Sequence, residues 1–239
     1  MIKKTLNQND IYVQELLNTI EPNFVFVEKP VNRFGFMESH NKEKKVAKID
    51  KLSILKKQIN SIENCNLKKN STNIVMGDGE INSSIMLIGE APGEIEDNTA
   101  QSFQGDVGSL LKKMLSAINI KMEKVYLTYA INFRPPQDRK PTSQEIKRYS
   151  VFLKEHITII DPKIIILMGS TAMEAVTGFN GRISNERGKW KEIILKNKTL
   201  PLMVTFSPSY LIRFPENKKH SWEDLKKIKI KIEDLGIKI

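Results

Sequence analysis

Apolar residues along this chain follow two patterns, which divide it near residue 61. From Ser61 onward, short apolar runs alternate with amphipathic segments. Four of the runs predict strands, at residues 85–88, 125–131, 164–168 and 202–206. Strands that alternate with helices in this way are typical of a parallel sheet covered on both faces. We therefore predict an α/β fold, a three-layer α/β/α sandwich around a central, mostly parallel four-stranded sheet.

The segments between these runs carry helix signals. Residues 105–118 place apolar side chains on one helical face. A second helix is predicted to begin at Thr142, where Thr-Ser-Gln-Glu forms a capping box, and to end at Asp161, because a residue before proline resists the α conformation. A final helix is predicted to open at Ser221, with Asp224 against its positive end.

Residues 1–60 lack this alternation. Helix-like segments are interrupted there by prolines and by a charged run at residues 41–45, although residues 51–59 have apolar positions at helical spacing. We predict that residues 1–60 form a partly helical and partly mobile N-terminal extension, and that residues 61–239 form the functional domain.

Charge and cysteine content narrow the range of functions. The net charge of +10 favours polyanionic partners, most simply nucleic acid, although the lysines are spread along nearly every segment. The single cysteine, Cys65, excludes an intramolecular disulfide and cannot alone hold zinc or an iron–sulfur cluster. Without an apolar leader or a run of about 18 apolar residues, the chain is expected to be cytoplasmic and monomeric, with no membrane contact.

The run at residues 85–88 leads directly into Gly89-Glu90-Ala91-Pro92-Gly93. In open α/β sheets, ligands bind beyond the carboxyl ends of the strands. Glu90 is therefore a candidate active-site acid. The alternative is a solvated acid in a tight glycine turn.

Two further loops follow predicted strands, at residues 132–141 and 206–213. Together with the first loop and its continuation through residues 102–111, they resemble, in order, the uracil-DNA glycosylase superfamily, most closely its family 4 branch, which usually carries an iron–sulfur cluster. The resemblance covers roughly Cys65 to the C-terminus. It implies an enzyme that extrudes uracil from DNA and hydrolyses its glycosidic bond.

The resemblance also implies roles for individual residues. Glu90 belongs to the catalytic, water-side part of the site, and Phe103 stacks on the extruded base. The other base-binding candidates are Tyr129, Ala91, Pro92 and Gly93. Ser207, with Ser209, would hold the leaving base or its phosphate. The candidates for DNA contact are Ser209, Arg213, Arg139 and Arg134, and further Lys140, Arg187, Lys218 and Lys219, each with a solvated surface charge as the alternative.

Two positions depart from the family pattern. Tyr129 stands where an Asn commonly reads the uracil edge, and a phenol cannot pair both ways as an amide can. Ser207 replaces a His that stabilises the departing base, and one lost donor in a dry site typically costs about 3 kcal/mol. Asp138 also replaces an Asn. His220 is the one histidine near the third loop and is a weaker candidate to replace the missing imidazole. Residues 210–212 are candidates to fill the gap that an extruded base leaves, with packing in the core as the alternative.

The cluster ligands of the family are missing. Cys65 matches one of the four cysteines, while Ile62, Phe133 and Tyr149 fall at the others. We therefore expect no cluster, no other cofactor and no metal.

Three other interpretations stay open. The chain could be a degenerate superfamily member that binds DNA or a protein without catalysis, or an enzyme for a different damaged base. It could also be a nucleotide-binding α/β protein, although Glu90 would repel a phosphate in its turn. The expected partner is uracil-containing DNA, single- or double-stranded, with no obligate protein partner.

Overall fold

The computed structural model describes residues 33–63 and 65–237, with side chains from residue 45 onward. The chain divides into a unit of residues 1–42 and a compact unit of residues 43–239. This division lies upstream of the predicted boundary near residue 60. Most of the predicted extension, residues 1–32, falls outside the described residues.

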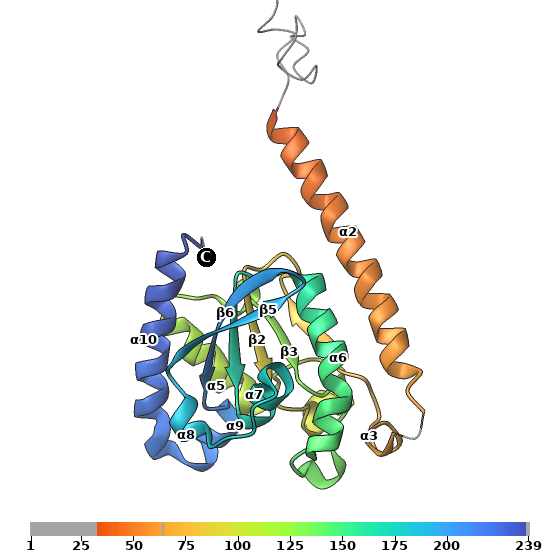
Figure 1. The fold of residues 1–239 in the computed structure, drawn as a ribbon, viewed down its shortest axis with the longest axis vertical. Coiled ribbons are helices and arrows are strands. Elements are labelled where there is room, and N and C mark those ends of the chain that lie inside the picture. The colour runs from red at the N-terminus through yellow and green to blue at the C-terminus, as the bar shows by residue number, and fades with distance from the viewer. Residues whose placement is uncertain (1–32, 64, 238–239) are drawn as a thin grey trace, which may run out of the picture. The chain divides into compact units, whose positions relative to one another are not determined.

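A six-stranded sheet forms the centre of the compact unit (Figure 1). Its order is β1-β3-β2-β4-β6-β5. The strands are β1 (Gly77–Gly79), β2 (Ile85–Gly89), β3 (Tyr126–Tyr129), β4 (Ile164–Met168), β5 (Trp190–Leu195) and β6 (Lys198–Thr205). The four predicted strands are the parallel middle of the sheet, whereas β1 and β5 pair antiparallel at its edges. The predicted fold class is confirmed, but the predicted number of strands was wrong.

The two missed strands lack the apolar run that marks a buried strand. β1 reads only Gly-Asp-Gly. β5 has one side exposed, as an edge strand can, and it turns into β6 through Lys196 and Asn197, both at positive φ. Positive φ at both central residues is the geometry of a tight hairpin turn.

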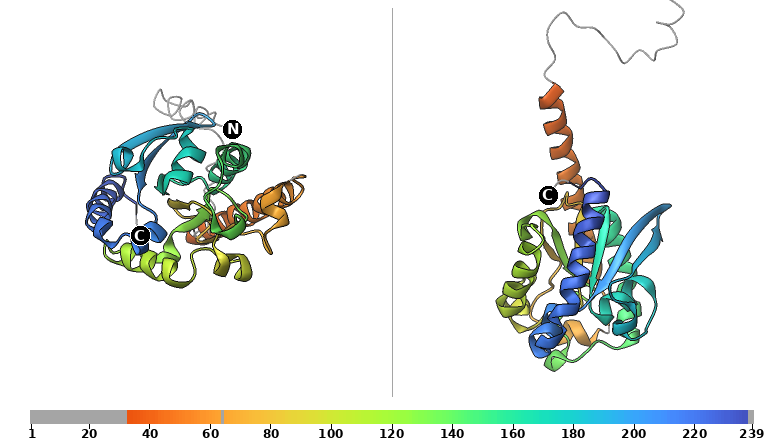
Figure 2. Two further views of the ribbon diagram at one scale, coloured as in Figure 1. Left: turned by 90° about the horizontal axis from the view of Figure 1, so that it is seen from below. Right: turned by 90° about the vertical axis from the view of Figure 1, so that its left-hand side faces the viewer.

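Helices cover both faces of the sheet (Figure 2). Residues of α6 and α7 pack in the core on one face, and residues of α5 and α10 pack on the other. The described helices are α2 (Arg33–Asn60), α3 (Asn66–Lys69), α4 (Glu94–Thr99), α5 (Gly105–Ser116), α6 (Ser143–Ile160), α7 (Ser170–Thr177), α8 (Ile183–Glu186), α9 (Pro208–Arg213) and α10 (Lys218–Asp234), with short 3-10 turns η1 (Met122–Lys124), η2 (Pro136–Asp138) and η3 (Pro215–Asn217).

The predicted helix starts had different outcomes. The capping box at Thr142 is confirmed, because its side chain accepts from the amide of Glu145 and the Glu145 carboxylate accepts from the amide of Thr142. The predicted start at Ser221 was wrong. α10 begins three residues earlier, at Lys218, and both Ser221 and Asp224 are buried within it.

The end of α2 is part of the core. Leu55 and Ile59 are buried to 0% and 1% exposure, as their helical spacing suggested. Lys48 donates a 2.7 Å hydrogen bond to the carbonyl of Ile160 at the end of α6. The end of α2 therefore packs with the compact unit of residues 43–239.

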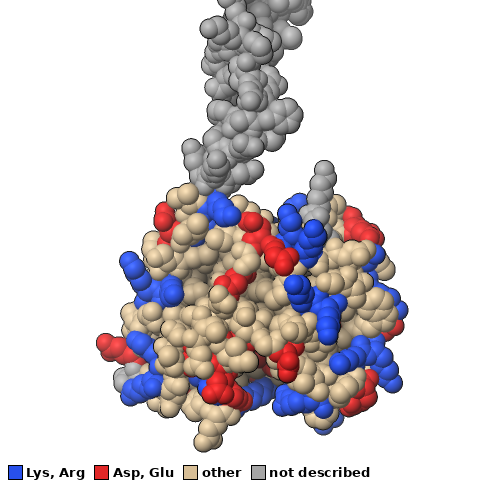
Figure 3. All heavy atoms as spheres, turned by 180° about the vertical axis from the view of Figure 1, so that it is seen from behind, with Lys and Arg blue, Asp and Glu red and all other residues tan. Residues whose placement is uncertain are grey.

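Charged side chains do not form a single patch on the face opposite the Figure 1 view. Lys and Arg lie in several separate places there, with Asp and Glu between them (Figure 3). In the described part of the chain, no helix is long and apolar enough to cross a membrane.

Candidate active site

A cavity of about 540 Å³ lies where the parallel strands end. Gly89 and Tyr129 are the last residues of β2 and β3, while Gly169 and Phe206 follow β4 and β6, and all four line it. The loops that are distant in sequence thus meet at one place. Every predicted catalytic and base-binding residue lines this cavity, and of the four principal DNA-contact candidates only Arg134 does not. The predicted catalytic, base-binding and DNA-contact residues in its wall are Glu90, Ala91, Pro92, Gly93, Phe103, Tyr129, Arg139, Lys140, Ser207, Ser209 and Arg213.

Glu90 is held by the start of α7. Its Oε1 accepts 3.1 Å from the amide of Thr171 and 3.4 Å from the hydroxyl of Ser170. Gly169 makes this approach possible, because a Cβ there would lie 2.4 Å from the carboxyl carbon of Glu90 and the residue has φ +105°. Neither Ser170 nor Gly169 was singled out from the sequence, although a glycine directly after a buried strand was a usable signal.

Phe103 and Tyr129 form a stacked pair in the cavity wall. Their ring centroids are 4.6 Å apart with 21° between the planes, and the Phe103 amide donates 2.9 Å to the Tyr129 hydroxyl. Each residue is only 4% exposed. Burial, with the nearby Glu96 carboxylate as the next cause, raises the pKa of Tyr129 well above its ordinary value. The phenol is therefore neutral at physiological pH.

Glu96 is a site residue that the sequence reasoning missed. Its buried carboxylate accepts from the amides of Gly93 (3.1 Å) and Gln104 (2.9 Å), so it joins the first turn to the Phe103 loop. Its place three residues after Gly93, at the start of α4, is a capping spacing that could have indicated it.

Ser207 is the N-cap of α9. Its Oγ accepts 3.3 Å from the Tyr210 amide and lies 3.0 Å from the Ser209 hydroxyl. Arg213 is exposed, and among the described residues it makes only a long 3.4 Å contact, to the Ser209 carbonyl. The structure thus brings the two predicted site residues Ser207 and Ser209 together, and the exposed Arg213 also lines the cavity. His220 lies in the first turn of α10 and does not line the cavity.

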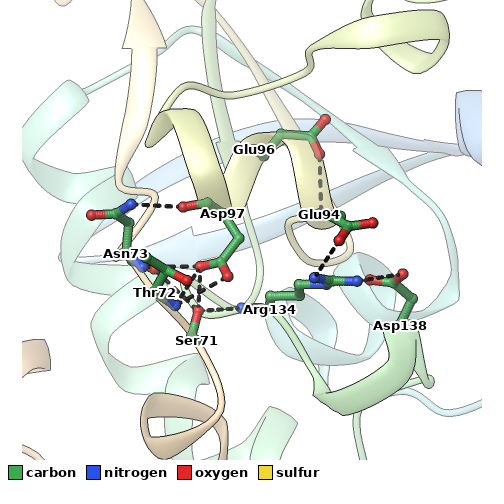
Figure 4. A network of polar contacts seen from close by, with 9 residues as sticks. Ser71, Thr72, Asn73, Glu94, Glu96, Asp97, Arg134 and Asp138 are labelled. Carbon is green, nitrogen blue, oxygen red and sulfur yellow. Dashed lines mark hydrogen bonds and ion pairs between the residues drawn. The ribbon is translucent and has the colours of Figure 1, made fainter.

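Arg134 and Arg139 are engaged by carboxylates. Arg134 pairs with Asp138 at 2.7 Å and 3.0 Å, and lies 3.7 Å from Glu94 (Figure 4). Arg139 pairs with both oxygens of Glu145 at 2.7 Å and 2.9 Å. That ion pair lowers the pKa of Glu145 to about 2. Arg134 therefore links the second loop to the start of α4, and Arg139 links the same loop to the start of α6. Their predicted DNA contacts stay predictions.

Asp97, like Glu96, is a buried carboxylate of α4 that holds neighbouring loops in place. Asp97 in α4 accepts hydrogen bonds from Ser71 (2.6 Å), Thr72 and Asn73 (Figure 4). Burial raises the pKa of Asp97, but these hydrogen bonds outweigh it and leave the pKa below its usual value. Ser71 in turn accepts from the amide of Arg134. The first and second loops are thus held by one polar network.

Arg187, also predicted as a DNA contact, makes several contacts within the protein, and its DNA contact stays a prediction. It pairs with the fully buried Asp224 at 2.5 Å and 3.0 Å, donates to the carbonyl of His220, and lies over the Phe206 ring at 5.5 Å. Burial raises the pKa of Asp224, and hydrogen bonds from Thr205 and Arg187 oppose that rise.

The residues at the cluster positions form apolar packing. Cys65 is buried with its sulfur 3.2 Å from the Tyr149 hydroxyl, and Phe133 meets Tyr149 edge-on at 6.3 Å. Ile62 packs against the same core. One thiol, one phenol and two hydrocarbon side chains do not provide the thiolate ligands that an iron–sulfur cluster needs. The residues present therefore do not fit the cluster of family 4.

The structure is that of an α/β protein with a cavity at the ends of its parallel strands, where ligands bind in open α/β sheets. The family model of the uracil DNA glycosylase superfamily matches residues 76–226. The chain belongs to the uracil-DNA glycosylase superfamily, as the sequence motifs indicated.

Three curated relatives share most of their length with this chain. It is 35% identical to the type-4 uracil-DNA glycosylase of Thermotoga maritima over 77% of this chain and 96% of the relative. It is 31% identical to that of Archaeoglobus fulgidus, over 75% and 92%, and 34% identical to that of Sulfurisphaera tokodaii, over 76% and 84%.

Proposed function

We propose that this protein is a DNA glycosylase that hydrolyses the N-glycosidic bond of an extruded uracil, or of another deaminated base, in DNA. The observation that carries the proposal is the placement of Glu90. One carboxylate oxygen is held by the start of α7, inside a cavity that also brings together Phe103 and the Ser207–Ser209 pair. A family relationship to uracil-DNA glycosylases supports the same reaction.

In this mechanism Glu90 positions the attacking water. Oε1 is fixed by Thr171 and Ser170, which leaves Oε2 to accept a proton from water without losing its own orientation. The water oxygen bonds to C1′ of the sugar while the bond from C1′ to the base nitrogen breaks. The base leaves with the electron pair, takes up a proton, and an abasic sugar remains.

Ser207 is the candidate donor to the leaving base. Its Oγ already accepts from the Tyr210 amide, so its position is fixed by the start of α9. When Ser209 donates to Ser207, the Ser207 proton is free to point into the cavity. A neutral hydroxyl in this place stabilises less negative charge than an imidazole would, so we expect a slow enzyme.

The test is base release from single- and double-stranded oligonucleotides that contain uracil, hypoxanthine or xanthine, with mass-spectrometric detection of the free base. We expect Glu90→Gln to lower the rate by about a hundredfold or more, the usual range for a positioned acid–base group. Glu94→Gln is the matched control, because Glu94 begins α4 directly after the turn of Glu90, carries the same charge and does not line the cavity. Equal rates for the two variants would refute the role of Glu90.

A second function, DNA binding without base release, is favoured by one observation. Phe103 is 4% exposed and stacked on Tyr129, so neither face of the ring is open to a base in this arrangement. Salt-sensitive binding to DNA with no release of any base in the panel would support that function.

A further inference from the structure

Tyr129 is the most unusual member of the cavity wall, because its ring already makes the contact that an extruded base would make. A flipped base is held by stacking on an aromatic side chain. Here the parallel partner of Phe103 is the phenol of Tyr129, at a centroid distance of 4.6 Å.

The surrounding residues hold the phenol in this position. Its hydroxyl accepts from the Phe103 amide, and Glu96 lies close enough to be the second cause, after burial, of its raised pKa. Glu96 is itself fixed by the amides of Gly93 and Gln104, on either side of Phe103 in sequence. The phenol is thus joined to the loop that presents the Phe103 ring.

The backbone of β2 also fits this ring pair. Gly89 lies beside Tyr129 in the register of β2 and β3, and a Cβ at Gly89 would come within 2.8 Å of both rings. Residue 89 must therefore be glycine for the two rings to stack where they do. Phe103 exposes only 4% of its surface, and the face that Tyr129 covers can take a base only after the Tyr129 ring is displaced.

We propose that the Tyr129 ring occupies the stacking place beside Phe103 and is thereby the specificity-determining residue of this site, disfavouring uracil there. This inference rests on the proposed function, because it concerns the same base site. Occupation by the ring is a different effect from the absence of the Asn amide that the family has at this position. If the ring occupies the stacking place, its removal should improve uracil binding even when no hydrogen-bonding group replaces it.

The test separates the ring from the hydroxyl. Tyr129→Asn and Tyr129→Ala remove the ring, whereas Tyr129→Phe keeps the ring and removes only the hydroxyl. Each change is made in the Glu90→Gln background to prevent turnover. Fluorescence anisotropy then compares oligonucleotides that carry one uracil or one abasic tetrahydrofuran residue at the same position.

We expect the preference for uracil over abasic-site DNA to rise about tenfold in Tyr129→Asn and by a smaller factor in Tyr129→Ala, since one base–aromatic stacking contact contributes at least about that factor. Tyr129→Phe should keep the preference of the parent. An unchanged preference in whichever ring-free variant keeps a cooperative unfolding transition would overturn the inference, as would an equal rise in Tyr129→Phe.

Base release by the same Tyr129 variants with Glu90 restored separates this inference from the proposed function. A rise in uracil preference without release of any base would leave the inference standing and refute the glycosylase reaction. Release of uracil by the parent, with no gain on removing the ring in either assay, would refute the inference and leave the reaction standing.

Discussion

Replacing Arg187 should damage the stability of the fold rather than its affinity for DNA. The guanidinium makes two hydrogen bonds to Asp224, at 2.5 Å and 3.0 Å, one to the carbonyl of His220, and a contact over the Phe206 ring. The Asp224 side chain is fully buried. Arg187→Ala therefore leaves a carboxylate without its charged partner inside the protein, with Thr205 as a remaining donor.

The size of the effect follows from this burial. Removal of one partner of a buried ion pair typically costs about 3–5 kcal/mol, because the other charge stays unpaired. For a unit of this size, that corresponds to a fall in Tm of roughly 6–20 °C, at about 2–4 °C per kcal/mol. Urea unfolding followed by circular dichroism measures the free energy directly.

Two further variants make the reasoning refutable. The double variant Arg187→Met/Asp224→Leu removes both charges and should regain much of the loss, since an apolar pair of similar volume is often neutral. Arg213→Ala removes an exposed arginine with a single 3.4 Å contact. It should leave stability within about 0.5 kcal/mol while lowering the salt dependence of DNA binding by about one phosphate contact. A stability loss below about 1 kcal/mol in Arg187→Ala, together with weakened DNA binding, would refute the structural role of this pair.

Three further predictions concern the cavity and the core. Gly169→Ala should lower the rate of base release by at least about tenfold, because its Cβ would lie 2.4 Å from the Glu90 carboxyl carbon. Gly178→Ala is the control, because Gly178 also has positive φ but has no neighbour within 4 Å of the added Cβ. It should cost only the backbone strain, about 1–3 kcal/mol of stability. Ser207→Ala should lower the free energy of unfolding by about 1 kcal/mol through loss of the α9 cap; no change in a urea titration would contradict this. Burial lowers the pKa of His156 from 6.5 to about 4. As pH falls, His156 is therefore protonated in the unfolded chain before it is protonated in the folded protein. The free energy of unfolding is unaffected by this group above about pH 6.5 and falls by up to about 3 kcal/mol as pH decreases toward 4. His156→Gln should remove the fall in that window, and an unchanged pH profile would argue against burial as its cause.

The middle of the sheet was predictable because its strands are buried on both faces. Such strands read as continuous apolar runs, as β2 and β4 do, and their order along the chain predicts a parallel arrangement. The edge strands β1 and β5 escaped prediction for the same reason, since neither is buried on both sides. The start of α10 was misplaced because Ser221 and Asp224 imitate a cap, while Asp224 in fact pairs with Arg187.

The candidate site was predictable as a set of loops and less so as a set of contacts. Glu90 could be located because it follows an apolar run at a strand end, and Ser207 because its loop resembles a motif of the family. The stacking of Tyr129 on Phe103 could not, because it depends on a glycine at position 89 of a different strand. Glu96 was missed because the sequence alone does not distinguish its buried carboxylate from the exposed carboxylate of Glu94, two residues earlier.

The central claim is that Glu90 drives hydrolysis of a glycosidic bond in this cavity. A single-turnover measurement of uracil release from a single-stranded oligonucleotide, with enzyme in excess, tests it most directly, because product release then does not limit the rate. We predict slow but measurable release by the parent protein, a loss of about a hundredfold or more in Glu90→Gln, and the parental rate in Glu94→Gln. Release that is undetectable in the parent, or equal in the parent and in Glu90→Gln, would contradict the account.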